Sequence, residues 1–310
     1  MRRVILFFLI AALPLFSFCP SVAAETVTWL SVEADSDTET LDLGDLNIGN
    51  YSAFGDFLAR LPRLKRVDMY GSFPKSEQID ALQERFPDVE FNFSIKIGKQ
   101  VVRTDATAFS TLFREGDHAT DYNHVSMIRY CRHLYALDIG HNPVGRLDFL
   151  YDLPELRVLI VAICNLRDIT PVASLEHLEY LEIFHNQIED ISCLTGLRYL
   201  MDLNLVRNRI SDLTPLTEIK SLRRLWINRC NHSDPSVPDP KTVMMLRGLL
   251  PRCEVNELSS STAGGWRKHP HYDTIHRMFN LGEYEPFEDS DPENMPEPWR
   301  TEHLQQTSGK

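Results

Sequence analysis

The sequence predicts an α/β fold of the solenoid type, in which successive coils stack short strands into one parallel sheet. Two observations predict it. Apolar residues recur every 22 residues through the middle of the chain, and within each coil they alternate with other residues as in a short strand. With 310 residues, 43% of them hydrophobic and 25% charged, the chain is long enough to bury a large core.

The repeat has four aligned columns. Three of them are apolar: Leu134, Leu156, Leu178, Leu200 and Leu222; Leu137, Leu159, Leu181, Leu203 and Leu225; and Ile139, Val161, Ile183, Leu205 and Ile227. The fourth column, expected to hydrogen-bond the backbone that turns out of each strand, is Asn142, Cys164, Asn186, Asn208 and Cys230. This L-x-x-L-x-L-x-x-N/C pattern is that of leucine-rich repeats.

The connections between strands divide the predicted solenoid into a middle and two ends. In the regular coils an Asp is followed two residues later by Thr or Ser, which favours an extended or 3₁₀ convex side. Residues 76–85 and 239–250 have helical patterns, so we expect helix-backed coils at both ends. The strand pattern recurs more weakly in Leu64-x-x-Val67-x-Met69, Phe86-x-x-Val89-x-Phe91 and Leu250-x-x-Cys253-x-Val255. We therefore expect the solenoid to run from about residue 41 to 255, with a hairpin over 95–102 and an irregular coil over 103–131.

The sequence divides into five predicted parts. Residues 1–24 have a basic start, an apolar run and a small-residue cleavage site, so we expect a signal peptide cleaved after Ala24 and a secreted or cell-surface protein. An uncleaved anchor and lipidation at Cys19 are less favoured alternatives. The other parts are an N-terminal cap with irregular leucine-rich coils over 25–133, five regular repeats over 134–232, a C-terminal helix-backed coil and cap over 233–282, and an acidic disordered tail over 283–310.

The run Asn186-x-Ile188-x-Asp190-Ile191-Ser and its counterparts resemble the 22-residue repeats of internalin-type secreted bacterial leucine-rich-repeat proteins. The resemblance covers roughly residues 134–227. It implies a right-handed solenoid whose concave parallel sheet binds a protein or peptide. Wall attachment and host-cell entry are not implied, because no Leu-Pro-x-Thr-Gly motif is present.

Strand residues that do not enter the core face the concave surface, where they are candidates for partner binding. This surface combines an apolar-aromatic patch, expected to be exposed, with an increasingly basic column. The candidate residues are Ile160, Tyr180, Glu182, Phe184, His185, Asn204, Val206, Arg207, Trp226 and Arg229. Such a surface fits a protein or peptide segment that offers an apolar anchor and carboxylates. Alternatively, the chain's own C-terminal tail covers the patch. We expect the tail's apolar stripe, which is Tyr272, Ile275, Met278 and Phe279, to cap the open end of the solenoid.

The sequence has no G-x-S-x-G, H-E-x-x-H, P-loop or G-x-G-x-x-G motif, so we expect a non-catalytic module without metal or cofactor. The histidine-rich segment with His269, His271, Asp273 and His276 has no standard metal-site spacing. An exported metal-dependent enzyme using residues 269–276 is one alternative function, and a self-associating structural surface protein is another. The net charge of −12 argues against nucleic acid as a partner. We also expect a monomer with no membrane span after signal cleavage. Of the six cysteines, the five that follow residue 24 are widely spaced, so we expect no disulfide framework.

Overall fold

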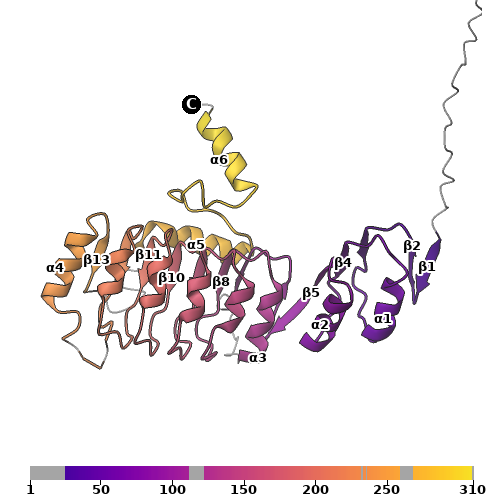
Figure 1. Cartoon of the computed structure of the whole chain (residues 1–310), viewed down its shortest axis with the longest axis horizontal. Helices are drawn as coiled ribbons and strands as arrows, with labels where there is room; N and C mark the ends of the chain where they lie inside the picture. The colour runs from indigo at the N-terminus through magenta and orange to yellow at the C-terminus, as the bar shows by residue number, and fades with distance from the viewer. Residues whose placement is uncertain (1–24, 112–121, 232, 235, 259–267, 309–310) are drawn as a thin grey trace, which may run out of the picture.

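The chain forms an elongated solenoid with a helix lying along one side of its sheet (Figure 1). The computed structural model describes residues 25–111, 122–231, 233–234, 236–258 and 268–308, so the expected signal peptide at 1–24 lies outside the described residues. Strands in these ranges form a two-stranded, a four-stranded and a seven-stranded sheet. None of the described helices combines the length and apolar character that crossing a bilayer requires.

The N-terminal end consists of a hairpin followed by helix-backed coils. The hairpin pairs β1 (Thr26–Trp29) with β2 (Val32–Asp35). The four-stranded sheet has the order β3-β4-β5-β6, with β3 at Thr40–Asp42, β4 at Arg66–Met69, β5 at Glu90–Ile97 and β6 at Gln100–Arg103. Helices α1 (Tyr51–Leu58) and α2 (Ser76–Arg85) connect the first three of these strands. The expected hairpin over 95–102 is confirmed, because β5 and β6 pair antiparallel around Gly98, which has a φ of 60°.

The regular repeats form the seven-stranded parallel sheet. Its strands are β7 (Ala108–Ser110), β8 (Ala136–Asp138), β9 (Val158–Ile160), β10 (Tyr180–Glu182), β11 (Asp202–Asn204), β12 (Arg224–Trp226) and β13 (Glu254–Asn256). Core leucines pair in register from Leu137 to Leu225, as the 22-residue period requires. The expectation of an irregular coil over 103–131 is wrong for β7, whose Phe109 pairs with Leu137 and so extends the sheet by one coil.

The convex side has the two kinds of connection that the sequence predicts. Five 3₁₀ turns follow one another: η1 (Ser126–Tyr130), η2 (Asp148–Asp152), η3 (Thr170–Ser174), η4 (Ser192–Gly196) and η5 (Thr214–Glu218). A carboxylate opens three of them, as where Asp168 accepts the backbone N–H of Thr170 at 2.8 Å. The short helix α3 (Tyr122–Val125) precedes η1, and α4 (Pro240–Leu249) backs the last coil. Helix-backed coils at both ends are therefore confirmed.

The strand register at both ends differs from the sequence expectation by two residues. The pattern aligned Val89 and Cys253 with the strand leucines, but Val67 pairs with Phe91 and Leu225 pairs with Val255. Val89 and Cys253 instead close the turn before the strand, where their N–H groups bond to carbonyls three residues back. These coils have one residue fewer between turn and strand than a regular coil, and the period-22 template does not allow for that deletion.

Buried Asn and Cys side chains bridge successive coils inside the solenoid. The Asn186 side-chain oxygen accepts the N–H groups of Cys164 and Leu166 at 2.9 and 3.1 Å, and its amide nitrogen donates to three carbonyls. The Cys164 thiol lies 3.3 Å from the carbonyl oxygen of Ile139. Each turn out of a strand would otherwise bury unpaired backbone groups, so these bonds satisfy a requirement of the fold.

The C-terminal end of the chain returns over the concave side of the seven-stranded sheet. Figure 1 shows α5 (Pro270–Leu281) lying along this sheet, with α6 (Trp299–Ser308) projecting beyond it. The expectation that the stripe on residues 272–279 caps the open end of the solenoid is wrong, because Ile275, Met278 and Phe279 belong to a buried cluster with side chains of β8, β9 and β10 on the concave face. The expectation of disorder after residue 283 is also wrong for the described residues, because Tyr284, Phe287 and Met295 are buried. The acidic composition of this stretch indicated disorder, and three widely spaced apolar residues do not form a pattern that would indicate packing.

Candidate functional site: the concave groove and its edge

The concave side of the seven-stranded sheet, here called the groove, has an apolar floor that is buried. The expectation that the apolar-aromatic patch is exposed is wrong. The alternative, that the chain's own C-terminus covers this patch, is confirmed. The C-terminal segment, residues 268–300, packs Ile275, Met278, Phe279, Tyr284 and Phe287 against the floor. The predicted floor residues, all at most 8% exposed, are Ile160, Tyr180, Glu182, Phe184, Asn204, Val206 and Trp226. Apolar surface on both partners drives this packing, because each side would otherwise face water.

A polar anchor fixes the register of the C-terminal segment on the sheet. Asn294 donates to the Glu179 carboxylate at 2.7 Å, and its backbone carbonyl accepts from Arg157 at 3.0 Å. Ser290 donates to the second Glu179 oxygen at 2.6 Å. Burial raises the pKa of Glu179, and the bonds from Ser290 and Asn294 oppose that rise. The sequence analysis did not identify these residues. Arg157 and Glu179 each lie one position before a strand, in a stretch whose pattern indicates a loop.

A second buried cluster joins the segment to β11 and β12. The Asp202 carboxylate lies 2.8 Å from Nδ1 of His271 and 3.6 Å from Nδ1 of His269, and it accepts from Nε of Arg224 at 2.7 Å. On the other side of its ring, Nε2 of His271 lies 2.6 Å from the Asp289 carboxylate. Burial lowers the pKa of His269 to about 4, so its imidazole is neutral near pH 7.

The residues of the histidine-rich segment differ in burial. His269 and His271 are buried, whereas Asp273 and His276 are exposed on the outer side of α5. The four residues therefore do not converge on one point, and the ligand set expected for an enzyme built on residues 269–276 is not assembled. The carboxylate that meets the two histidines is Asp202, 67 residues before His269 in the sequence.

The basic column of candidates lies at the rim of the groove and remains accessible. His185 and Arg229 are exposed and Arg207 is partly exposed; these three are here called the basic edge. All have left-handed backbone, with φ between 48° and 60°, at the equivalent position of successive coils. A positive φ is uncommon for residues other than glycine, so its recurrence in three successive coils is a property of this turn. Nε of Arg207 is buried with no hydrogen-bond partner among the described residues, and its guanidinium lies 5.6 Å from the Phe184 ring centroid.

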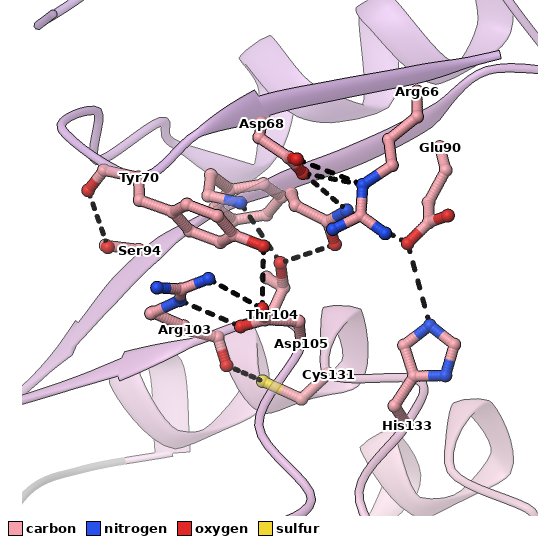
Figure 2. Close-up of polar contacts among 12 residues, drawn as sticks. Arg66, Asp68, Tyr70, Glu90, Ser94, Arg103, Thr104, Asp105, Cys131 and His133 are labelled. Carbon is pink, nitrogen blue, oxygen red and sulfur yellow. Dashed lines mark hydrogen bonds and ion pairs between the residues drawn. The ribbon is translucent and has the colours of Figure 1, made fainter. Parts of the chain in front are cut away.

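Figure 2 shows a network of polar side chains on the four-stranded sheet and beside it. Arg66 bonds to Asp68 at 2.9 Å, while Tyr70 donates to Asp105 at 2.8 Å. Arg103 also bonds to Asp105, and its guanidinium carbon lies 3.5 Å from the Tyr70 ring centroid. Burial raises the pKa of Tyr70 to about 12. Because these groups satisfy one another, this network stabilises the N-terminal coils and is not a strong candidate for binding.

The described cysteines are free thiols. Burial raises the pKa of Cys164 and Cys230 to about 12 and that of Cys193 to about 11. A thiol that stays protonated at neutral pH is a poor nucleophile. Cys131, Cys164 and Cys230, which are buried, therefore have the character of small core residues.

Stacked parallel strands with an Asn/Cys column and 3₁₀ backs define a leucine-rich-repeat solenoid. A family model described as "Leucine Rich repeat" matches residues 174–193. No curated protein sequence matches the chain.

Similar solved structures include several leucine-rich-repeat proteins. An internalin of Listeria monocytogenes is 15% identical with a TM-score of 0.37, over 73% of this chain and 57% of that one. This chain therefore spans little more than half the length of that internalin. A leucine-rich-repeat protein of Leptospira interrogans is 16% identical with a TM-score of 0.37, over 64% and 74%. The Arabidopsis receptor kinase HAESA, solved with a peptide hormone and a co-receptor, is 18% identical with a TM-score of 0.32, over 60% and 32%.

Proposed function

We propose that this protein is an exported, non-catalytic interaction module that binds an acidic segment of a partner protein along its basic edge. The observation that carries the proposal is the division of the groove. Its apolar floor is covered by the C-terminal segment, while His185, Arg207 and Arg229 remain accessible in one row beside it.

The energetics favour the edge over the floor as the partner site. A partner reaching the floor must displace Ile275, Phe279 and Phe287, each of which is at most 7% exposed. Leaving such a side chain in water costs about 1.5–3 kcal/mol. Displacing the three costs roughly 4–9 kcal/mol before any gain from the partner. The floor candidates of the sequence prediction therefore serve to hold the chain's own segment, and the edge candidates serve the partner.

The edge has the spacing and chemistry to recognise carboxylates. Adjacent strands lie about 4.8 Å apart, so side chains at equivalent positions of successive coils form a regular row. An extended segment rises about 3.3 Å per residue, so carboxylates at alternate positions lie about 6.6 Å apart, and the long arginine side chains must span the difference from the spacing of about 4.8 Å between coils. Arginine binds a carboxylate through two parallel N–H bonds, and Arg229 is the exposed arginine of the edge.

The test is a charge reversal with a matched control. We expect Arg207→Glu with Arg229→Glu to weaken binding of a labelled acidic peptide at least 10-fold at low salt. The control reverses Arg198 and Arg252, two exposed arginines outside the edge, and changes the net charge equally. We expect the control to retain wild-type affinity. Fluorescence anisotropy gives the dissociation constants, and circular dichroism checks that all variants fold.

Three outcomes would contradict the proposal. Equal loss in both double variants would mean that binding follows net charge and not the edge. An oligonucleotide that competes as well as the peptide would point to a nucleic-acid partner. Light scattering that shows stable oligomers of the wild-type chain, dissociated by the edge variant, would favour the self-associating alternative.

A further inference from the structure

We propose that Asp202, His269 and His271 bind one divalent transition-metal ion, with zinc the best fit, and that the ion fastens the C-terminal segment to the concave sheet. Asp202 belongs to β11, whereas the two histidines lie at the start of α5. An ion held by all three therefore links parts of the chain that pack together only in the folded state. The proposal is independent of partner binding at the basic edge.

The separations between the ligand atoms suit a tetrahedral site. Zinc lies about 2.0–2.1 Å from nitrogen and oxygen ligands, which places two tetrahedral ligands roughly 3.3 Å apart. The Asp202 oxygen lies 2.8 Å from Nδ1 of His271 and 3.6 Å from Nδ1 of His269, so the two distances bracket that value. One ligand atom from each of the three residues lies within 4.8 Å of the others. Binding of an ion would require the ligand atoms to draw closer to that spacing.

Each proposed ligand is oriented by a neighbour on its far side. Nε2 of His271 faces Asp289 at 2.6 Å, which favours a proton on Nε2 and a lone pair on Nδ1. Nε2 of His269 lies 3.5 Å from the Tyr180 hydroxyl. Nε of Arg224 binds the other oxygen of Asp202 at 2.7 Å. Outer partners of this kind fix the tautomer and direction of metal ligands, and they distinguish a built site from a chance cluster.

Arg224 does not occupy the proposed ion position. Its Nη2 lies 3.0 Å from Nδ1 and 3.1 Å from Nε2 of His271. A nitrogen nearly equidistant from both ring nitrogens at that range lies over the ring face, because an in-plane position would collide with the carbon between them. The in-plane lone pair of Nδ1 is therefore left to the ion. Asp202 and Asp289 offset part of the positive charge that the ion adds beside Arg224.

The donor set selects the class of metal. Two imidazole nitrogens and one carboxylate oxygen suit zinc and its neighbours, whereas magnesium and calcium prefer all-oxygen sites. The three ligands are at most 6% exposed. This burial favours a structural ion, with a water as fourth ligand, over a site open to substrate.

The test uses the full mature chain, prepared without a histidine tag and stripped of metal. We expect calorimetry to show binding of one equivalent of zinc, and cobalt to give the visible absorption of a tetrahedral site. At a zinc concentration 100 times the dissociation constant, the melting temperature should rise by about 5 °C. Zinc should also slow hydrogen exchange in α5 and β11.

Ligand variants and a matched histidine control locate the ion. Asp202→Asn and His271→Gln should weaken zinc binding by more than the roughly 10–100-fold that loss of an outer partner costs. His276→Gln, an exposed histidine on the same helix, should bind like the wild type. The proposal is overturned if the wild type binds no stoichiometric zinc, or if His276→Gln loses binding as much as His271→Gln. Should the ligand variants misfold, the cobalt spectrum and the exchange pattern of the wild type decide the question.

Discussion

Phe287→Ala tests whether the C-terminal segment is an integral part of the fold. Phe287 is 1% exposed, and its ring stacks on His271 with centroids 3.9 Å apart and 10° between the planes. Its centroid also lies 6.3 Å from that of Tyr180, on the floor of the groove. Truncating a buried Phe to Ala costs about 3–5 kcal/mol, because apolar area is lost and a cavity remains. At about 2 °C per kcal/mol, the melting temperature should fall by roughly 6–10 °C.

The assay follows unfolding by calorimetry and by the fluorescence of Trp226, which lies in the same apolar cluster. Metal is removed with a chelator in all samples, so that only packing is compared. The matched control is Leu281→Ala, because Leu281 belongs to the same segment but is 70% exposed. A surface change of this kind should cost less than about 0.5 kcal/mol. If Phe287→Ala destabilises the protein no more than Leu281→Ala does, the segment is not docked as described and the reasoning fails.

Three further predictions concern the solenoid and its polar anchor. Asn186→Ala should lower the free energy of unfolding, measured in urea, by on the order of 3 kcal/mol. The reason is that several buried backbone groups lose their hydrogen-bond partner, and each loss costs about 1–3 kcal/mol. Asn186→Cys should recover part of this stability. Glu179→Gln should flatten the pH dependence of stability. The folded-state pKa of Glu179 is raised, so the wild type loses stability as pH rises from the unfolded pKa through the folded one, and the variant should not show that loss. Cys164 and Cys230 should resist a thiol reagent at pH 8 until the chain unfolds, since burial raises each pKa to about 12; rapid native labelling of either would argue against their interior position.

The regular coils were predictable because every coil must meet the same packing and hydrogen-bonding requirements. A leucine must enter the core at the same height in each turn, and Asn or Cys must satisfy the same backbone groups, so both leave a strict period in the sequence. At the ends the period fails. After the turn that ends at Val89 or Cys253, the strand begins one residue earlier than in a regular coil. A pattern with fixed spacing therefore assigns these two residues to the strand position of the core leucine, although they belong to the turn.

The candidate site was predictable only in part. Alternation along a strand identifies which side chains leave the core, so the floor and the edge were both found. Whether a side chain that leaves the core meets water or another segment depends on contacts distant in sequence. Phe184 and His185 are consecutive in the sequence, yet Phe184 is 8% exposed and His185 lies open.

The sequence by itself determined the solenoid, its parallel register through the regular repeats, its 3₁₀ backs and the interior column of Asn and Cys. These features recur in every regular coil, and this recurrence makes them predictable from the sequence. Only the tertiary structure decided that residues 268–300 cover the groove, and that Asp202 meets two histidines from the far end of the chain. The physical reason is that a few widely spaced anchors, such as Phe287 and Asn294, fix that segment through contacts with the sheet and leave no period of their own.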